Sequence, residues 1–217
     1  MLKGRSITRA RRRRNSSPPL LKWSGPGAVL AGVLFAAWGY FHKGSAPQPP
    51  DAIASALGLV VPLLFSLGLA GCYVWSRGRT GWWLGWLGFV FGFIGSGLGV
   101  AYRLLDIAGI ATTADRYGYA VGKGWPPQLF DWFPWLLVGL TLIGIASVKT
   151  RSLRGWAPLP LVMGLFGWAY YLSDPGGIVQ MQVVHVLFGV LFSLGWVLLG
   201  YLLWSKGAGR HTGVPRR

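Results

Sequence analysis

Six apolar segments separated by short polar connections make up most of this chain. An α-helix needs roughly 17 to 25 residues to cross the hydrocarbon layer of a bilayer, which is about 30 Å thick. The segments are residues 26–42, 53–75, 82–102, 132–148, 156–172 and 181–204. The pattern predicts an all-α integral membrane protein with six transmembrane helices.

The composition agrees with a membrane environment. Hydrophobic residues make up 53% of the 217 positions and charged residues only 12%, whereas roughly 25% of the residues of soluble proteins are charged. The single cysteine, Cys72, excludes an internal disulfide and a site with several thiolates within one chain. We therefore expect a membrane domain over residues 26–204, with an N-terminal tail over 1–25 and a C-terminal tail over 205–217.

Lys and Arg are concentrated in alternate connections, and this sets the expected orientation because cytoplasmic loops carry the excess. One set of connections contains Lys3, Arg5, Arg9, Arg11, Arg12, Arg13, Arg14, Lys22, Arg77, Arg79, Lys149, Arg151, Arg154, Lys206, Arg210, Arg216 and Arg217. The other contains Lys43, Arg103, Arg116, Lys123 and every acidic residue, namely Asp51, Asp106, Asp115, Asp131 and Asp174. Both termini are thus predicted to be cytoplasmic. The overall pattern of spans and charges resembles that of small six-span proteins, and we expect a multi-pass protein of the bacterial plasma (inner) membrane.

The N-terminal run RARRRRNSSPP predicts a disordered basic tail. Such a tail attracts anionic lipid headgroups, at about 1 kcal/mol for each basic residue near the surface. Nucleic-acid-binding proteins instead carry their charge along a folded groove or helix face. We expect the lipid bilayer, and no nucleic acid, to be the partner of this tail.

Two hairpins echo each other in the sequence. Residues 67–95 and 140–167 each contain an apolar helix, a short Arg-containing turn and a Gly-Trp pair that opens the next helix. They could form a parallel helical-hairpin repeat of the kind found in some transporters. The alternative is that cytoplasmic hairpins commonly end in Arg and an interfacial Trp.

Small residues follow one face of two predicted helices. Gly or Ser recurs at intervals of three and four in the third span, and Ala28, Gly32 and Ala36 do the same in the first. Small residues let helix backbones approach closely in lipid, which favours packing against other helices, including those of a membrane-protein partner or a homo-oligomer. The positions in the third span are Gly85, Gly88, Gly92, Ser96 and Gly99. Pro62 interrupts the backbone hydrogen bonding of the second span and predicts a kink.

His185 is the main functional candidate because an ionisable residue inside a span is costly to bury. It shares a helix face with Gly189 and Ser193 and should point into the bundle, towards a neighbouring helix or Asp174. The outer loop at 103–131 is long enough to be a functional cap. The other candidates are Asp174, Asp106, Asp115 and Asp131.

Three site chemistries can be compared with these residues. A Ser96–His185 pair is similar to the dyad of six-span rhomboid-type intramembrane proteases, but Ile94 occupies the position of that family's Gly and the serine is on a different span. His42 and His185 could ligate a haem, although His42 ends its helix. The Asp residues could attract a cation, yet Asp106, Asp115 and Asp131 can equally pair with Arg103, Arg116 and Lys123.

We expect no cofactor and no enzymatic activity. The leading hypothesis is a non-enzymatic accessory or assembly subunit of a membrane complex. The alternatives are a small-solute carrier or channel, supported by the hairpin similarity and Pro62, and a membrane enzyme or redox subunit that uses His185.

Overall fold

A computed structural model describes residues 19–43, 51–77, 82–110, 131–151, 154–173 and 179–208, and all regular structure within them is helical. The α-helices are α2 (Pro19–Lys43), α3 (Asp51–Ser76), α4 (Trp82–Ile107), α6 (Trp132–Thr150), α7 (Leu159–Leu172) and α8 (Val179–Ala208). A short 3₁₀ helix, η2 (Arg154–Trp156), precedes α7.

The helices coincide with the six predicted segments but mostly extend beyond them. α2 begins at Pro19 and α8 ends at Ala208, so both include residues assigned to the tails. α4 continues to Ile107, into the expected outer loop. Hydropathy detects only the apolar part of a helix, whereas backbone hydrogen bonding continues into the polar turns at either end.

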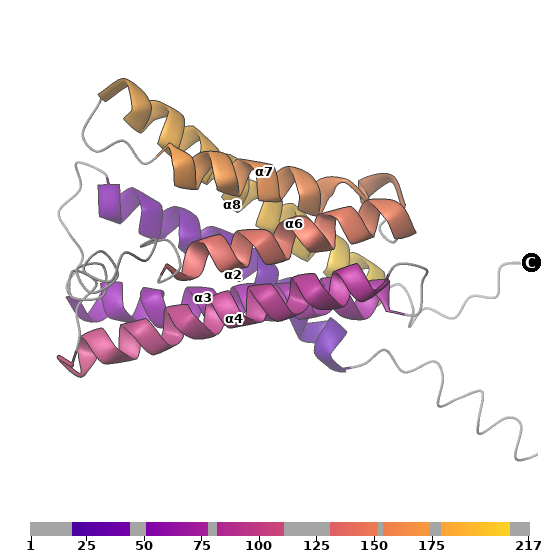
Figure 1. Ribbon diagram of the computed structural model, residues 1–217, viewed down its shortest axis with the longest axis horizontal. Coiled ribbons are helices and arrows are strands. Elements are labelled where there is room, and N and C mark those ends of the chain that lie inside the picture. The colour runs from indigo at the N-terminus through magenta and orange to yellow at the C-terminus, as the bar shows by residue number, and fades with distance from the viewer. Residues whose placement is uncertain are drawn as a thin grey trace, which may run out of the picture.

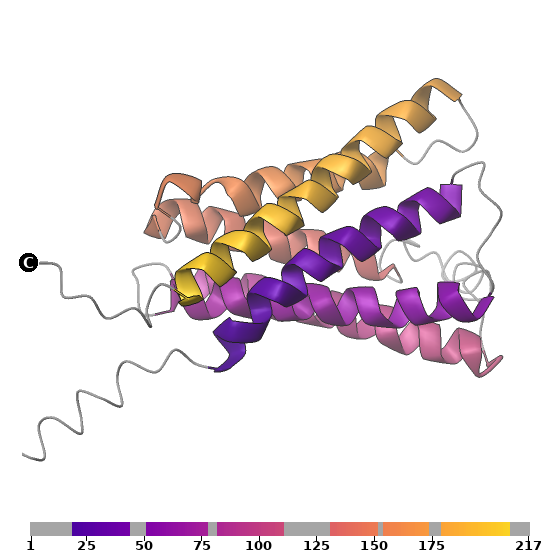
Figure 2. The same ribbon diagram turned by 180° about the vertical axis from the view of Figure 1, so that it is seen from behind.

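The helices form a closed ring in which each packs against the next, and α8 packs against α2 (Figure 1). α3 also touches α6 and α8 across the ring. Figure 2 shows that α2 and α8 lie close together towards the chain termini and diverge towards the opposite end. An even number of antiparallel helices places the start of α2 and the end of α8 at the same end of the bundle.

We call this the tail end, and it carries the starts of α2, α4 and α7 together with the ends of α3, α6 and α8 (Figure 1). The opposite end, where α2, α4 and α7 finish, is the loop end. Lys22, Arg77 and Lys149 lie at the tail end, whereas Arg103 and Asp131 lie at the loop end. The two predicted sets of charged residues are therefore separated by the length of the bundle, as far as the described residues extend.

Aromatic side chains fill the centre of the ring. Phe35 of α2 is almost fully buried, and its ring lies within 6 Å of four rings from four other helices. These are Phe65 at 5.6 Å, Phe133 at 5.7 Å, Tyr170 at 5.6 Å and Phe192 at 5.3 Å. Trp196, with no exposed surface, packs on Phe65 at a ring separation of 4.6 Å. The axis of the bundle is thus packed with side chains.

Glycines set the closest helix contacts, between α4 and α6 and between α2 and α8. A Cβ added at Gly88 would lie 2.6 Å from the Gly139 carbonyl oxygen. A Cβ at Gly25 would lie 2.7 Å from the Trp204 nitrogen. The small-residue face of the third predicted span therefore packs inside the chain, which is the use expected of such residues in lipid.

The outward surface suits a lipid environment. Large apolar side chains face outward on all of the α-helices, a pattern that soluble monomers avoid. Four helices, α3, α4, α6 and α8, are long and apolar enough to cross a membrane. α7 is apolar but has only 14 residues. α3 continues through Pro62, whose ring packs against Gly99 of α4.

Candidate functional site at the loop end

His185 points into the bundle, as its helix face predicts. It lies about 9 Å along α8 from Val179, at 1.5 Å per residue, and only 4% of its surface is exposed. Its ring packs on that of Tyr170 in α7, with centroids 3.9 Å apart and an interplanar angle of 33°. The imidazole is therefore held between α7 and α8 at the level where α7 ends.

Ser173, the C-cap of α7, is the polar neighbour of this imidazole. Its hydroxyl donates to the Tyr170 carbonyl oxygen at 3.1 Å, and its oxygen lies 3.4 Å from His185 Nδ1. The donor in the contact with His185 depends on the imidazole tautomer. Ser173 thus links the last turn of α7 to His185 of α8.

Asp131 has a local structural role at the start of α6. It is the N-cap residue, and its Oδ1 accepts a hydrogen bond of 3.2 Å from the Phe133 amide. The Tyr171 side chain also bonds to this carboxylate. Burial raises the pKa of Asp131 above its ordinary value, and the hydrogen bonds from Phe133, Tyr171 and Trp132 offset only part of that increase. Loss of solvent around the charged form accounts for the direction of the shift.

The last turn of α7 connects these two groups. Tyr170 contacts His185 on α8, whereas the adjacent Tyr171 contacts Asp131 at the start of α6. Successive residues of a helix point about 100° apart, so neighbouring tyrosines can reach different helices. The result is a polar and aromatic link across α6, α7 and α8, which we call the loop-end cluster: Asp131, Tyr170, Tyr171, Ser173 and His185.

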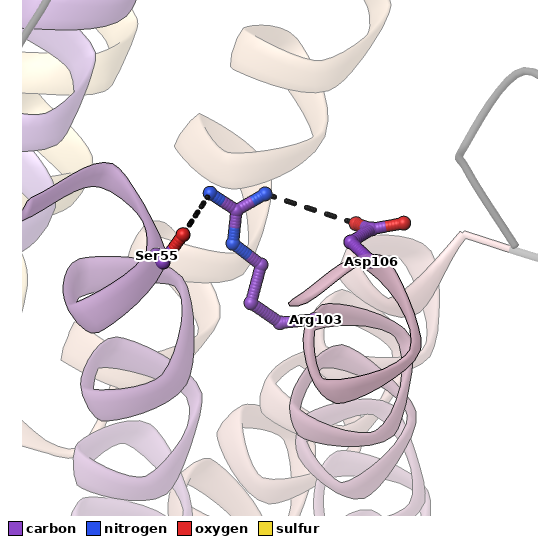
Figure 3. A network of polar contacts seen from close by, with 3 residues as sticks. All are labelled: Ser55, Arg103 and Asp106. Atoms are coloured by element: carbon purple, nitrogen blue, oxygen red, sulfur yellow. Dashed lines mark hydrogen bonds and ion pairs between the residues drawn. The ribbon is translucent and has the colours of Figure 1, made fainter. Parts of the chain in front are cut away.

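A second polar group lies between α3 and α4 (Figure 3). The Arg103 guanidinium donates to Ser55 Oγ at 3.1 Å and forms an ion pair with Asp106 at 3.7 Å. Gly58 makes room for the Arg103 side chain, because a Cβ added at Gly58 would lie only 3.2 Å from Cγ and Cδ of Arg103. The suggested pairing of Asp106 with Arg103 is confirmed, and it gives Asp106 a structural partner.

The suggested protease dyad is not assembled. Ser96 is buried on α4, and α6 and α7 separate that helix from α8 in the ring. The serine beside His185 is Ser173. Asp115, Asp174 and the His42 side chain lie outside the part of the chain that the structure describes. Within the described residues, no three His, Cys, Asp or Glu side chains are grouped to hold a metal ion.

Sequence reasoning missed Tyr170, Tyr171 and Ser173. The available signal was the pair of tyrosines near the end of an otherwise apolar helix, the second of them three residues before Asp174. Tyrosine combines an apolar ring with a polar tip, which suits a helix end at a membrane interface. Which neighbouring helix each tyrosine contacts depends on the order of the helices around the bundle, and the sequence does not specify that order.

Comparisons with protein-family models, with curated proteins and with solved structures gave no match to this chain.

Proposed function

We propose that this chain is a non-enzymatic accessory or assembly subunit of a membrane complex. In this proposal all six helices cross the bilayer of a bacterial plasma membrane, and both termini are cytoplasmic. The excess of Lys and Arg at the tail end supports this orientation. The outward apolar surface supports insertion.

The packed axis of the ring carries the proposal. Phe35, Phe65 and Phe192 meet at the centre and are almost fully buried. A channel or carrier needs a water-lined route or two alternative packings of its helices. This core favours a rigid building block over the carrier or channel alternative.

The glycine contacts add to that argument. At Gly139 the backbone of α6 lies against Gly88 and Gly92 of α4, and at Gly200 the backbone of α8 lies against Gly25 of α2. Sliding of either pair would force atoms that are already in contact to overlap. Because these glycine faces are used within the chain, a protein partner would bind through outward residues such as Phe93 and Leu104 of α4.

Purification from the native membrane tests this function. A tagged full-length chain, extracted in mild detergent, should elute as a complex of fixed stoichiometry. Tagging the identified partner should in turn recover this chain. Replacing Leu104 by Trp on the outward face should reduce recovery of the partner, whereas the same change at Ile53 on α3 serves as the control. Recovery of the native chain free of any partner contradicts the proposal.

A membrane enzyme or redox subunit is the second candidate, and the observation that favours it is the inward-facing imidazole of His185. If His185 ligates haem in the native membrane, the purified protein should show a Soret band that disappears in His185→Ala. A spectrum without that band removes the haem version of this candidate.

A further inference from the structure

The outward-facing tryptophans gather at the tail end of the bundle. Trp23, near the start of α2, has 69% of its surface exposed. The others at this end are Trp82, Trp83, Trp86, Trp156 and Trp204. At the loop end, Trp38, Trp132 and Trp168 instead pack against the core. Tryptophan concentrates at the headgroup level of membranes, so only the tail end presents a belt of this kind among the described residues.

Exposed cations lie at the same level as this belt. Lys22 adjoins Trp23 on α2, Arg77 follows the end of α3, and Lys149 lies in the last turn of α6. The five acidic residues of the sequence are at positions 51, 106, 115, 131 and 174, and none belongs to a tail-end connection. Among the described residues, the acidic positions 51, 106 and 131 all lie at the loop end, so none of them is placed to neutralise Lys22, Arg77 or Lys149.

We propose that this rim, formed by Lys22, Arg77, Lys149 and the tail-end tryptophans, binds the headgroups of anionic phospholipids in one leaflet. Indole rings prefer the interface, and the cations beside them attract lipid phosphates. The tryptophans favour a lipid surface over an acidic protein or nucleic acid, which would need no ring of indoles at a single depth. The proposal rests on the membrane insertion proposed above, and it extends lipid recognition from the N-terminal tail to the folded bundle.

Quenching of tryptophan fluorescence by brominated lipids tests the site directly. The full-length chain is reconstituted in phosphatidylcholine vesicles that contain brominated phosphatidylcholine or brominated phosphatidylglycerol. We expect phosphatidylglycerol to bind the rim more tightly than phosphatidylcholine does. Each cation should contribute about fivefold, the ratio that corresponds to about 1 kcal/mol. The preference should fall as salt rises, because the headgroup interaction is screened.

Variants locate the effect. Arg77→Gln with Lys149→Gln should abolish most of the preference, whereas Lys43→Gln, which removes one cation at the loop end, should leave it unchanged. If the double variant does not fold, the preference of the wild-type chain for phosphatidylglycerol over phosphatidylcholine, and its decrease with salt, still test the proposal.

The outcomes separate the two proposals. Equal quenching by the two lipids overturns the headgroup site and leaves membrane insertion standing. Lack of quenching by both overturns insertion as well. Displacement of phosphatidylglycerol from the rim by polyglutamate or duplex DNA, at matched charge, shows a site for an acidic macromolecule and contradicts the lipid assignment.

Discussion

Gly139 shows how much of the packing depends on single side chains. It lies on α6 against the backbone of Gly88 and Gly92, so an added methyl group would meet peptide atoms that cannot move aside. Gly97, also in mid-helix, has open space around an added Cβ. The same substitution at these two glycines should therefore have opposite effects.

We expect Gly139→Ala to lower the free energy of unfolding by about 1 to 3 kcal/mol, the usual cost of overpacking a tight contact. Gly97→Ala should be neutral or stabilising by up to about 1 kcal/mol, because alanine is the better helix former. Thermal unfolding of both variants in the same detergent measures the difference. Equal transition temperatures would show that α4 and α6 are not in backbone contact.

His185 can be tested by separating its ring from its hydrogen bond. His185→Phe keeps a ring against Tyr170 but loses the contact with Ser173, whereas His185→Ala loses both. We expect the alanine variant to be destabilised by about 1 to 3 kcal/mol and the phenylalanine variant by less. Ser173→Ala is the matched change on the other partner. If all three variants unfold like wild type while partner binding or haem content is lost, His185 has a functional role and not a structural one.

The sequence predicts the inward direction of His185 because the period of a helix defines its faces. It also suggests the Arg103–Asp106 pair, because both residues fall in the predicted outer loop. The structure extends α4 to Ile107, so the two residues are helical neighbours three positions apart. The link from Tyr171 to Asp131 is different, because it joins α7 to the start of α6 through tertiary packing. No local pattern specifies the relative rotation of two helices.

Helix ends differ from the apolar segments in ways that hydropathy cannot detect. α7 begins at Leu159, three residues later than predicted, because residues 154–156 form η2. Pro158 and Pro160 favour a helix start at this point, since proline fits the first helical turn. The hairpins formed by α3–α4 and α6–α7 both turn at the tail end, but α7 has 14 residues and α4 has 26. A parallel repeat remains a prediction.

The N-cap of α6 gives a prediction about pH. The pKa of Asp131 is raised in the folded protein, so the folded state retains its proton to a higher pH than the unfolded state does. The stabilisation from that proton is complete below the ordinary pKa and is lost as pH rises through the raised value. Asp131→Asn keeps a capping oxygen but cannot ionise. From about pH 4 to about pH 7, the stability of wild type relative to Asp131→Asn should therefore fall.

Transition temperatures measured across that pH range check the prediction. Asp131→Ala removes the cap and should cost about 1 kcal/mol more than Asp131→Asn. A wild-type advantage over Asp131→Asn that grows with pH would mean that the hydrogen bonds outweigh burial and that the pKa of Asp131 is lowered.

Ring closure is the property that the sequence leaves open. Charge and hydropathy indicate six helices with the two chain ends on one side, but they do not specify that α8 returns to α2. That contact depends on close backbone approach at Gly25 and Gly200, which are 175 positions apart. The sequence contains many glycines that could pack against another helix, and it does not indicate that these two meet. The packed aromatic centre follows from this closure, because Phe35 and Phe192 come from the two helices that close the ring.

The central claim is that a closed six-helix bundle lies across a membrane with its tail end inside, and cysteine accessibility tests it most directly. In a Cys72→Ser background, which has no other cysteine, single cysteines are introduced into successive connections. A membrane-impermeant thiol reagent added to intact cells should label residues placed in 44–50, 111–130 and 174–178. It should reach those in 1–18, 78–81 and 152–153 only after the cells are opened. Labelling of the second set in intact cells, or a pattern that fails to alternate, would contradict the account.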